Sequence, residues 1–266
     1  MLVEYSASSF QRSSPPCRDT NPLIERLKMF VSLGVEEIAA IETMCSNRRI
    51  IRANETLVRE GSRPDRVYLV LSGVAFRYRF LAVGRRQILG YLLPGDLCDT
   101  QFVILNEADH NVGLLSDSEV AVISLSVLMK TMVAYPKIER ALLMMSLVDA
   151  AMLREWLLNV GQRDAFQKLA HFFCELNARF GSLGLHEEAA GFNIPLTQNE
   201  LADTMGLTVV HVNRMLQRFR HEGLLNWSRR HVEILNYPQL EYLAGFDPGY
   251  LRLEQKCVEP QMCAYG

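Results

Sequence analysis

Residues 194–225 read IPLTQNELADTMGLTVVHVNRMLQRFRHEGLL, and this stretch decides the fold of the C-terminal part of the chain. Thr197 and Glu200 form the T-x-x-E pattern of a capping box, which predicts the start of a helix. Gly206 supplies a turn, because a residue without Cβ readily takes a positive φ, and Thr208 can cap a second helix. Two helices joined by a short glycine turn are typical of a helix-turn-helix that reads DNA.

The second helix of this pair has one apolar and one polar face. Its inward positions recur at helical spacing and are Val212, Met215, Leu216 and Phe219. On the outward face, Arg214 can bridge O6 and N7 of guanine, Asn213 can pair with adenine, and Val210 can contact the methyl group of thymine. We therefore predict a set of DNA-binding residues: Thr208, Val209, Val210, His211, Asn213, Arg214, Gln217, Arg218, Arg220, Arg229 and Arg230.

Basic residues gather in this part of the chain. Between Leu207 and His231 there are five arginines against the single acidic residue Glu222, whereas the whole chain has a net charge of −2. Such a local patch is what contacts to DNA phosphates require. Residues 224–236, LLNWSRRHVEILN, predict two short strands around a Ser-Arg-Arg turn, which is a wing placed to touch the DNA backbone.

The N-terminal half has a different pattern. Helical spacing over residues 21–40 is followed by short β-rich runs such as VYLVL (67–71) and QILGYLL (87–93), which glycines separate. Two further runs, NVGLLS (111–116) and EVAVISL (119–125), close this segment. Many short strands at this spacing predict a β-sandwich or a jelly-roll barrel.

A long helix is predicted between these two regions. Pro136 suits the first turn of a helix, and the helical pattern continues to Val160 until Gly161 ends it. A second helix is predicted over residues 162–180. An apolar stripe on a helix this long needs a partner, so we predict a dimer interface made by Ile138, Leu142, Met145, Val148, Met152 and Trp156.

Composition places the chain among globular proteins, since 49% of its 266 residues are hydrophobic and 22% are charged. No apolar run approaches the roughly 20 residues of a membrane span, and residues 1–20 lack a secretory signal, so we expect a cytoplasmic protein without membrane contact. The six cysteines are widely spaced, which predicts neither a metal site nor a cofactor. Cys98 is either a redox-sensitive thiol or, as we favour, a small hydrophobic residue. No catalytic motif is present, and we expect no enzyme.

The order of jelly roll, long helix and helix-turn-helix resembles the Crp/Fnr family of transcription regulators, from about Leu23 to Leu235. The most specific parts are the helix-turn-helix quoted above, VREGSRPDRVYLVLSGVAFRYRF (58–80) and YLLPGDLCD (91–99). The resemblance implies an eight-stranded β-roll sensor, a dimer helix and a winged DNA-binding domain on a palindromic operator, with RNA polymerase as a further partner. The family's base-reading positions correspond here to Val209, Val210, Asn213 and Arg214, of which Arg214 is the family's arginine.

The sensor departs from the family pattern. Cyclic-nucleotide binders of the family have a Gly-Glu pair after the P-G-D turn and then an Arg-Ser pair, whereas here Asp99 and Thr100 stand near the first position and no arginine lies between Asp96 and Asp117. We expect an acidic, arginine-free pocket that repels a phosphate. The clustered N-terminal cysteines that would hold an iron–sulfur cluster are missing. His110 is a lone candidate for an axial ligand of haem. We therefore expect an effector that is absent or is not a cyclic nucleotide.

These observations predict an α+β fold: an N-terminal jelly-roll β-barrel, a long dimerisation helix and a C-terminal winged helix-turn-helix. The expected boundaries are a disordered tail at 1–20, the β-roll at 21–132, the dimerisation helix at 133–160, the DNA-binding domain at 161–241 and a C-terminal tail at 242–266. The expected function is that of a transcription regulator that binds double-stranded DNA as a homodimer. The alternative is a ligand-sensing adaptor that acts mainly through protein contacts.

Overall fold

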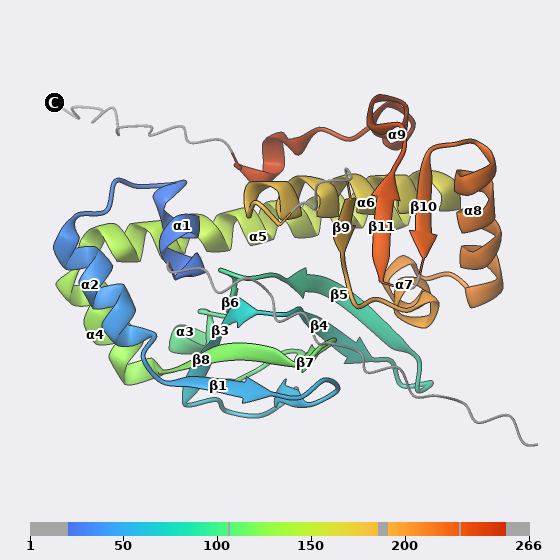
Figure 1. Cartoon of the computed structure of the whole chain (residues 1–266). Helices are drawn as coiled ribbons and strands as arrows, with labels where there is room; N and C mark the ends of the chain where they lie inside the picture. The colour runs from blue at the N-terminus through green and yellow to red at the C-terminus, as the bar shows by residue number, and fades with distance from the viewer. Residues whose placement is uncertain (1–20, 106, 186–190, 229, 254–266) are drawn as a thin grey trace, which may run out of the picture.

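The computed structural model describes residues 21–105, 107–185, 191–228 and 230–253. Two short helices, α1 (Pro22–Lys28) and α2 (Val35–Met44), begin the described chain. Asn21 caps α1, because its side-chain oxygen accepts a hydrogen bond from the backbone N–H of Leu23. These helices lie against one end of the long helix and beside the β-roll (Figure 1).

The β-roll consists of two four-stranded antiparallel sheets, as the jelly-roll prediction requires. The first sheet has the order β1-β8-β3-β6 and contains β1 (Arg48–Ile51), β8 (Ser118–Ser124), β3 (Arg66–Ser72) and β6 (Leu97–Cys98). The second has the order β2-β7-β4-β5 and contains β2 (Thr56–Val58), β7 (Asn111–Leu114), β4 (Ala75–Phe80) and β5 (Arg86–Leu92). A single turn of helix, α3 (Phe102–Leu105), lies between β6 and β7. Buried aliphatic side chains between the sheets include Val67, Leu69, Val112 and Leu114.

Two helices follow the β-roll: α4 (Leu125–Ala134), which the sequence pattern did not reveal, and the long α5 (Pro136–Gln162). The predicted dimer stripe on α5 is wrong in part. Ile138, Leu142 and Val148 are at most 5% exposed because they belong to the core that the chain's own helices and β-roll form. They are therefore not available to a second chain.

The other predicted stripe residues are half-buried and also pack within the chain. Trp156 lies against Tyr91 and Phe172, and its Nε1 donates to Oε2 of Glu175 at 2.9 Å. Met145 packs on the core that contains Ile138 and Leu142. Met152 packs both on that core and on the one that contains Phe172. The exposed apolar residues of α5 lie at other positions: Leu143, Leu147, Leu153, Leu157, Leu158 and Val160.

The C-terminal domain begins with α6 (Ala165–Ser182), whose capping box at Asp164 and Gln167 separates it from α5. The helix-turn-helix consists of α7 (Gln198–Met205) and α8 (Val209–His221). The predicted wing is present as the antiparallel pair β10 (Leu225–Ser228) and β11 (His231–Ile234). A third strand, β9 (Gly191–Asn193), pairs with the other side of β11.

Residues 242–253 do not form a tail, contrary to expectation. The helix α9 (Tyr237–Ala244) and the 3-10 turn η1 (Pro248–Leu251) complete the domain. Leu251 is buried, and the Tyr250 hydroxyl donates to Oε2 of Glu175 at 2.8 Å. The expected tails at residues 1–20 and 254–266 lie outside the described residues.

The β-roll and the DNA-binding domain meet at β5 and α7, which lie side by side in Figure 1. The Tyr91 hydroxyl is 2.6 Å from Oγ1 of Thr204, and both side chains are buried. Arg86 Nε donates to Oδ2 of Asp203 at 2.8 Å, and Gln87 Nε2 donates to the carbonyl oxygen of Thr204 at 3.0 Å. The strand β5 of the β-roll therefore contacts α7, the first helix of the helix-turn-helix, directly.

Candidate nucleic-acid interface and sensor cluster

The helix-turn-helix is built by the local interactions that its sequence predicts. Oγ1 of Thr197 accepts from the backbone N–H of Glu200 at 3.3 Å, and Oε2 of Glu200 accepts from the backbone N–H of Thr197 at 2.7 Å. Gly206 ends α7 with φ of 65°, a left-handed conformation that glycine adopts without strain. Thr208 caps α8 by accepting from the backbone N–H of His211 at 3.2 Å.

One face of α8 is fixed by packing. Val212 and Phe219 are fully buried, and the Phe219 ring stacks on Phe166 of α6 with centroids 4.1 Å apart. The opposite face is open: Val210 is 81% exposed, and Asn213 and Arg214 are also exposed. The inward and outward positions of α8 therefore lie where helical spacing predicts them.

Three amide side chains on the open face form a chain of hydrogen bonds. Gln217 Nε2 donates to Oδ1 of Asn213 at 3.0 Å, and Asn213 Nδ2 donates to Oε1 of Gln198 at 3.3 Å. These contacts orient the Asn213 amide before any ligand approaches. Gln198 belongs to α7 and was not among the predicted residues, because helix periodicity within α8 carries no information about a neighbouring helix.

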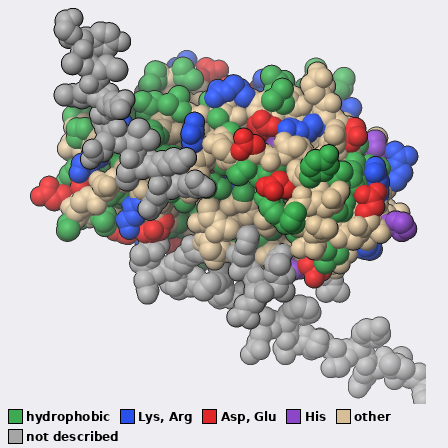
Figure 2. All heavy atoms as spheres, turned by 90° about the horizontal axis from the view of Figure 1, so that it is seen from above, with side chains coloured by type: hydrophobic (Ala, Val, Ile, Leu, Met, Phe, Trp, Pro, Cys, Tyr) green, Lys and Arg blue, Asp and Glu red, His purple; other side chains and the backbone are tan. Residues whose placement is uncertain are grey.

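The predicted basic residues differ in their surroundings. Arg218 Nε donates to Oε1 of Glu222 at 2.6 Å, and its guanidinium group lies 3.9 Å from the centre of the Phe166 ring. Arg220 and Arg230 are exposed, as are Thr208, Val209 and Gln217, whereas His211 is half-buried. Arg229 lies outside the described residues. Arginine and histidine side chains gather at the end of the molecule where α8 lies (Figure 2).

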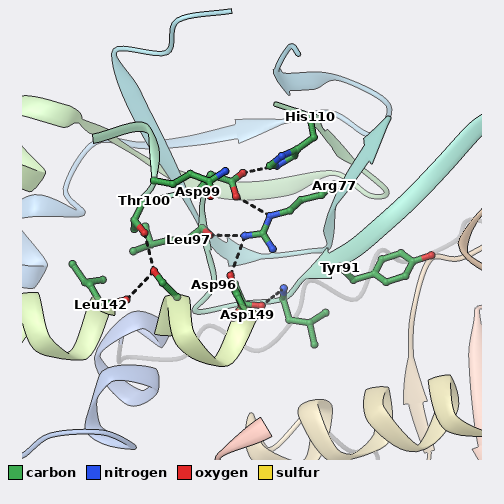
Figure 3. Close-up of polar contacts among 12 residues, drawn as sticks. Arg77, Tyr91, Asp96, Leu97, Asp99, Thr100, His110, Leu142 and Asp149 are labelled. Atoms are coloured by element: carbon green, nitrogen blue, oxygen red, sulfur yellow. Dashed lines mark hydrogen bonds and ion pairs between the residues drawn. The ribbon is translucent and has the colours of Figure 1, made fainter. Parts of the chain in front are cut away.

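The second group of polar residues lies where the β-roll meets α5. It is called here the sensor cluster and consists of Arg77, Asp99, His110, Asp109 and Asp149. Arg77 extends from β4 between two carboxylates (Figure 3): its Nε donates to Oδ1 of Asp99 at 2.9 Å and its Nη2 to Oδ2 of Asp149 on α5 at 3.2 Å. The two ring nitrogens of His110 lie 2.8 Å from Oδ2 of Asp99 and 2.7 Å from Oδ1 of Asp109.

The expectation of an arginine-free pocket was wrong. Arg77 lies 22 positions before Asp99 in the sequence, and the sheet brings the two side chains together. Burial alone would raise the pKa of Asp99, but the charges and hydrogen bonds of Arg77 and His110 outweigh burial and lower it. Asp99 is therefore ionised and paired, and it does not present a free negative charge.

His110 is also satisfied by its neighbours. Burial alone would lower the pKa of His110, but the hydrogen bonds and charges of Asp99 and the hydrogen bond of Asp109 raise it above its ordinary value. Paired on both ring nitrogens, His110 is held as part of an ion-pair network and is not placed as an open axial ligand.

Cys98 is a poor candidate for redox chemistry. Its side chain is fully buried, and burial raises the pKa of its thiol far above the ordinary range. Because the thiolate is the reactive form, a buried and protonated thiol is inert. In the residues that the structure describes, no group of three histidine, cysteine or acidic side chains could hold a metal ion. No helix in the same described part of the chain has the length and apolar character to cross a bilayer.

Comparison with known proteins agrees with this division of the chain. Residues 48–135 match the family model of the cyclic nucleotide-binding domain, and residues 167–243 match that of the Crp-like helix-turn-helix domain. The transcriptional activator protein FnrA of Stutzerimonas stutzeri is 27% identical over 229 residues, which cover 86% of this chain and 92% of that protein. The transcriptional activator protein FnrL of Cereibacter sphaeroides is 29% identical over 215 residues, which cover 80% and 86%.

A solved structure has the same architecture. FixK2 from Bradyrhizobium japonicum superposes with a TM-score of 0.67 at 24% identity and covers 75% of this chain and 98% of that one. The two family models together match more than half of the 266 residues, in the order β-roll and then helix-turn-helix. The chain therefore belongs to the Crp/Fnr family of transcription regulators.

Proposed function

We propose that this protein regulates transcription by binding a palindromic DNA operator as a homodimer, with one α8 in each half-site. The observation that carries the proposal is the division of α8 into a packed face and an open face. Val212 and Phe219 fix the helix on α6, while Asn213 and Arg214 stay exposed. A recognition helix must combine a rigid position with an accessible polar surface to read bases in the major groove.

In this proposal Arg214 reads a guanine, because its guanidinium group can donate to O6 and N7 together. Asn213 reads a neighbouring adenine, and Val210 adds a contact with a thymine methyl group. Arg218, Arg220, Arg229 and Arg230 would contact phosphates, which supply affinity without sequence preference. Replacing a base-reading arginine typically costs about 1–3 kcal/mol on the specific site.

The proposed dimer interface is the exposed face of α5 and not the buried stripe. Leu143, Leu147, Ala150, Arg154 and Leu157 follow one another at alternating spacings of four and three residues, as in one seam of a coiled coil. Leu143, Leu147 and Leu157 are 61%, 59% and 72% exposed. Burial of these side chains against a second copy would pair two α8 helices, which have to lie about 34 Å apart to enter two half-sites.

The sensor cluster supports an effector that is absent or is not a cyclic nucleotide. The two basic side chains of the cluster that could hold a phosphate are already paired, Arg77 with Asp99 and Asp149 and His110 with Asp99 and Asp109. We also propose the cytoplasm as the site of action and RNA polymerase as a partner, in line with transcription regulation. No catalytic activity is assigned to the protein.

The test is selection of bound sequences from a random DNA pool with purified, ligand-free protein. We expect a palindrome with a guanine in each half, and loss of the preference for that guanine in an Arg214→Ala variant. Enrichment of no sequence, together with an unchanged elution volume on size-exclusion chromatography with DNA, would contradict the proposal and favour the adaptor function.

A further inference from the structure

The loop after β6 is connected to α5 at two places. At the first, Arg77 bridges Asp99 of the loop and Asp149 of α5, with N–O distances of 2.9 and 3.2 Å. At the second, Oγ1 of Thr100 is 3.2 Å from Oγ of Ser146, which itself donates to the carbonyl oxygen of Leu142. Figure 3 shows both connections between the β-roll and the long helix.

The polar groups at this junction satisfy one another. Arg77 uses Nε for Asp99 and Nη2 for Asp149, and Asp99 uses its second oxygen for His110. Among the described residues, each charged side chain of the sensor cluster has a partner of opposite charge or a hydrogen-bonded imidazole. A free anion would have to break the Arg77 ion pairs before it could bind here, and breaking the pair with Asp99 would leave a poorly solvated carboxylate.

A series of contacts leads from Asp149 to the recognition helix. Further along α5, Trp156 donates to Glu175 of α6. At the start of α6, the Phe166 ring stacks on Phe219 of α8. A shift of α5 relative to the β-roll would therefore also move α6 and α8.

We propose that Arg77, Asp99 and Asp149 act as a built-in substitute for an effector: they hold α5 against the β-roll, and thereby position the recognition helices, with no small molecule bound. Arg77 and Asp149 are positioning residues, because they act on DNA binding through α5 and contact no base. The inference rests on the proposed function, since its readout is operator binding.

The experiment measures Kd by fluorescence anisotropy for the selected operator and for random DNA, using the full chain without small molecules. The variants are Arg77→Gln, Asp149→Asn and the double variant. Arg79→Gln is the matched control, because Arg79 is on the same strand but pairs with Glu60 of the β-roll and not with α5. Circular dichroism and thermal unfolding check that each variant is folded.

We expect each single variant to lose about tenfold in operator affinity, within the range of coupling between two sites, and to keep the wild-type affinity for random DNA. The double variant should be no weaker than the weaker single variant, because the Arg77–Asp149 ion pair is already absent from each single variant. Arg79→Gln should bind as wild type does.

Three results would overturn the inference: single variants with wild-type operator affinity, fully additive losses in the double variant, or an equal loss on operator and random DNA, which indicates a merely structural role. Asp149→Asn keeps the test valid if Arg77→Gln fails to fold, since Asp149 is partly exposed. Wild-type protein that binds its operator only after addition of a small molecule would refute the inference and leave the proposed function intact. Binding to no sequence under either condition would refute both.

Discussion

The hydrogen bond between Tyr91 and Thr204 connects the β-roll to the helix-turn-helix, and its direction follows from the structure. The Thr204 hydroxyl donates its only hydrogen to the carbonyl oxygen of Glu200, at 2.7 Å. Its Oγ1 is therefore the acceptor, and Tyr91 is the donor, in the 2.6 Å contact between them. Both side chains are at most 2% exposed, so water cannot replace either partner.

This arrangement predicts unequal effects for two conservative substitutions. Tyr91→Phe removes one neutral hydrogen bond but leaves Thr204 bonded to Glu200, and it should lower the free energy of unfolding by about 0.5–1.5 kcal/mol. Thr204→Val leaves the buried Tyr91 hydroxyl without an acceptor and should lower that free energy by about 1–3 kcal/mol. The double variant should lose less than the sum, because it contains no unpaired hydroxyl.

Urea unfolding followed by circular dichroism measures these differences. Tyr242→Phe serves as the control, since Tyr242 is 81% exposed and its substitution should change stability by no more than about 0.5 kcal/mol. A Thr204→Val variant that is as stable as Tyr91→Phe, or fully additive losses in the double variant, would refute the assigned direction of the hydrogen bond.

Three further predictions concern DNA binding, assembly and pH. Arg214→Ala should weaken binding to the operator by about 1–3 kcal/mol and relax the base preference, whereas Arg220→Ala should weaken binding to all sequences and reduce the slope of log K against log salt by about 1, as salt titrations with operator and random DNA would show. Leu157→Glu should shift sedimentation toward the monomer, because it places a charge in the proposed seam; an unchanged dimer would exclude this face of α5. The folded protein has a raised pKa at His110, so the stability that His110 contributes is fully present below its ordinary pKa of 6.5 and is lost as pH rises through the folded value. The stability difference between wild type and His110→Gln should therefore shrink from acidic to alkaline pH, and a difference that is independent of pH would contradict the ion-pair assignment.

Features that depend on neighbouring residues were predictable from the sequence. The capping box at Thr197, the turn at Gly206 and the cap at Thr208 act within three or four residues, and the structure has all three. Helical spacing also placed Val212 and Phe219 in the core. The helix α4 was missed, because its apolar residues continue directly from β8 without a glycine or proline to separate them.

The two faces of α5 show where a sequence pattern stops being informative. An apolar stripe indicates that a helix face is buried, but the pattern is the same whether the covering surface belongs to the same chain or to another. Ile138 and Leu142 satisfy the criterion for a dimer stripe and are covered by the chain's own core, whereas Leu143 and Leu157 are left open. Only the placement of the β-roll and the short helices separates these possibilities.

The wrong expectation for the sensor cluster has a similar cause, because a sequence window shows only the charges of residues that are near in the chain. A window around Asp99 contains acidic residues and no arginine, so its local charge predicts repulsion of an anion. The jelly-roll topology places β4 beside this loop, and Arg77 then supplies the missing positive charge. Once Arg77 is paired with Asp99 and Asp149, its guanidinium group is not free to hold a phosphate. What the cluster does is connect two elements: Arg77 joins β4 of the β-roll to α5, the helix that leads to the DNA-binding domain.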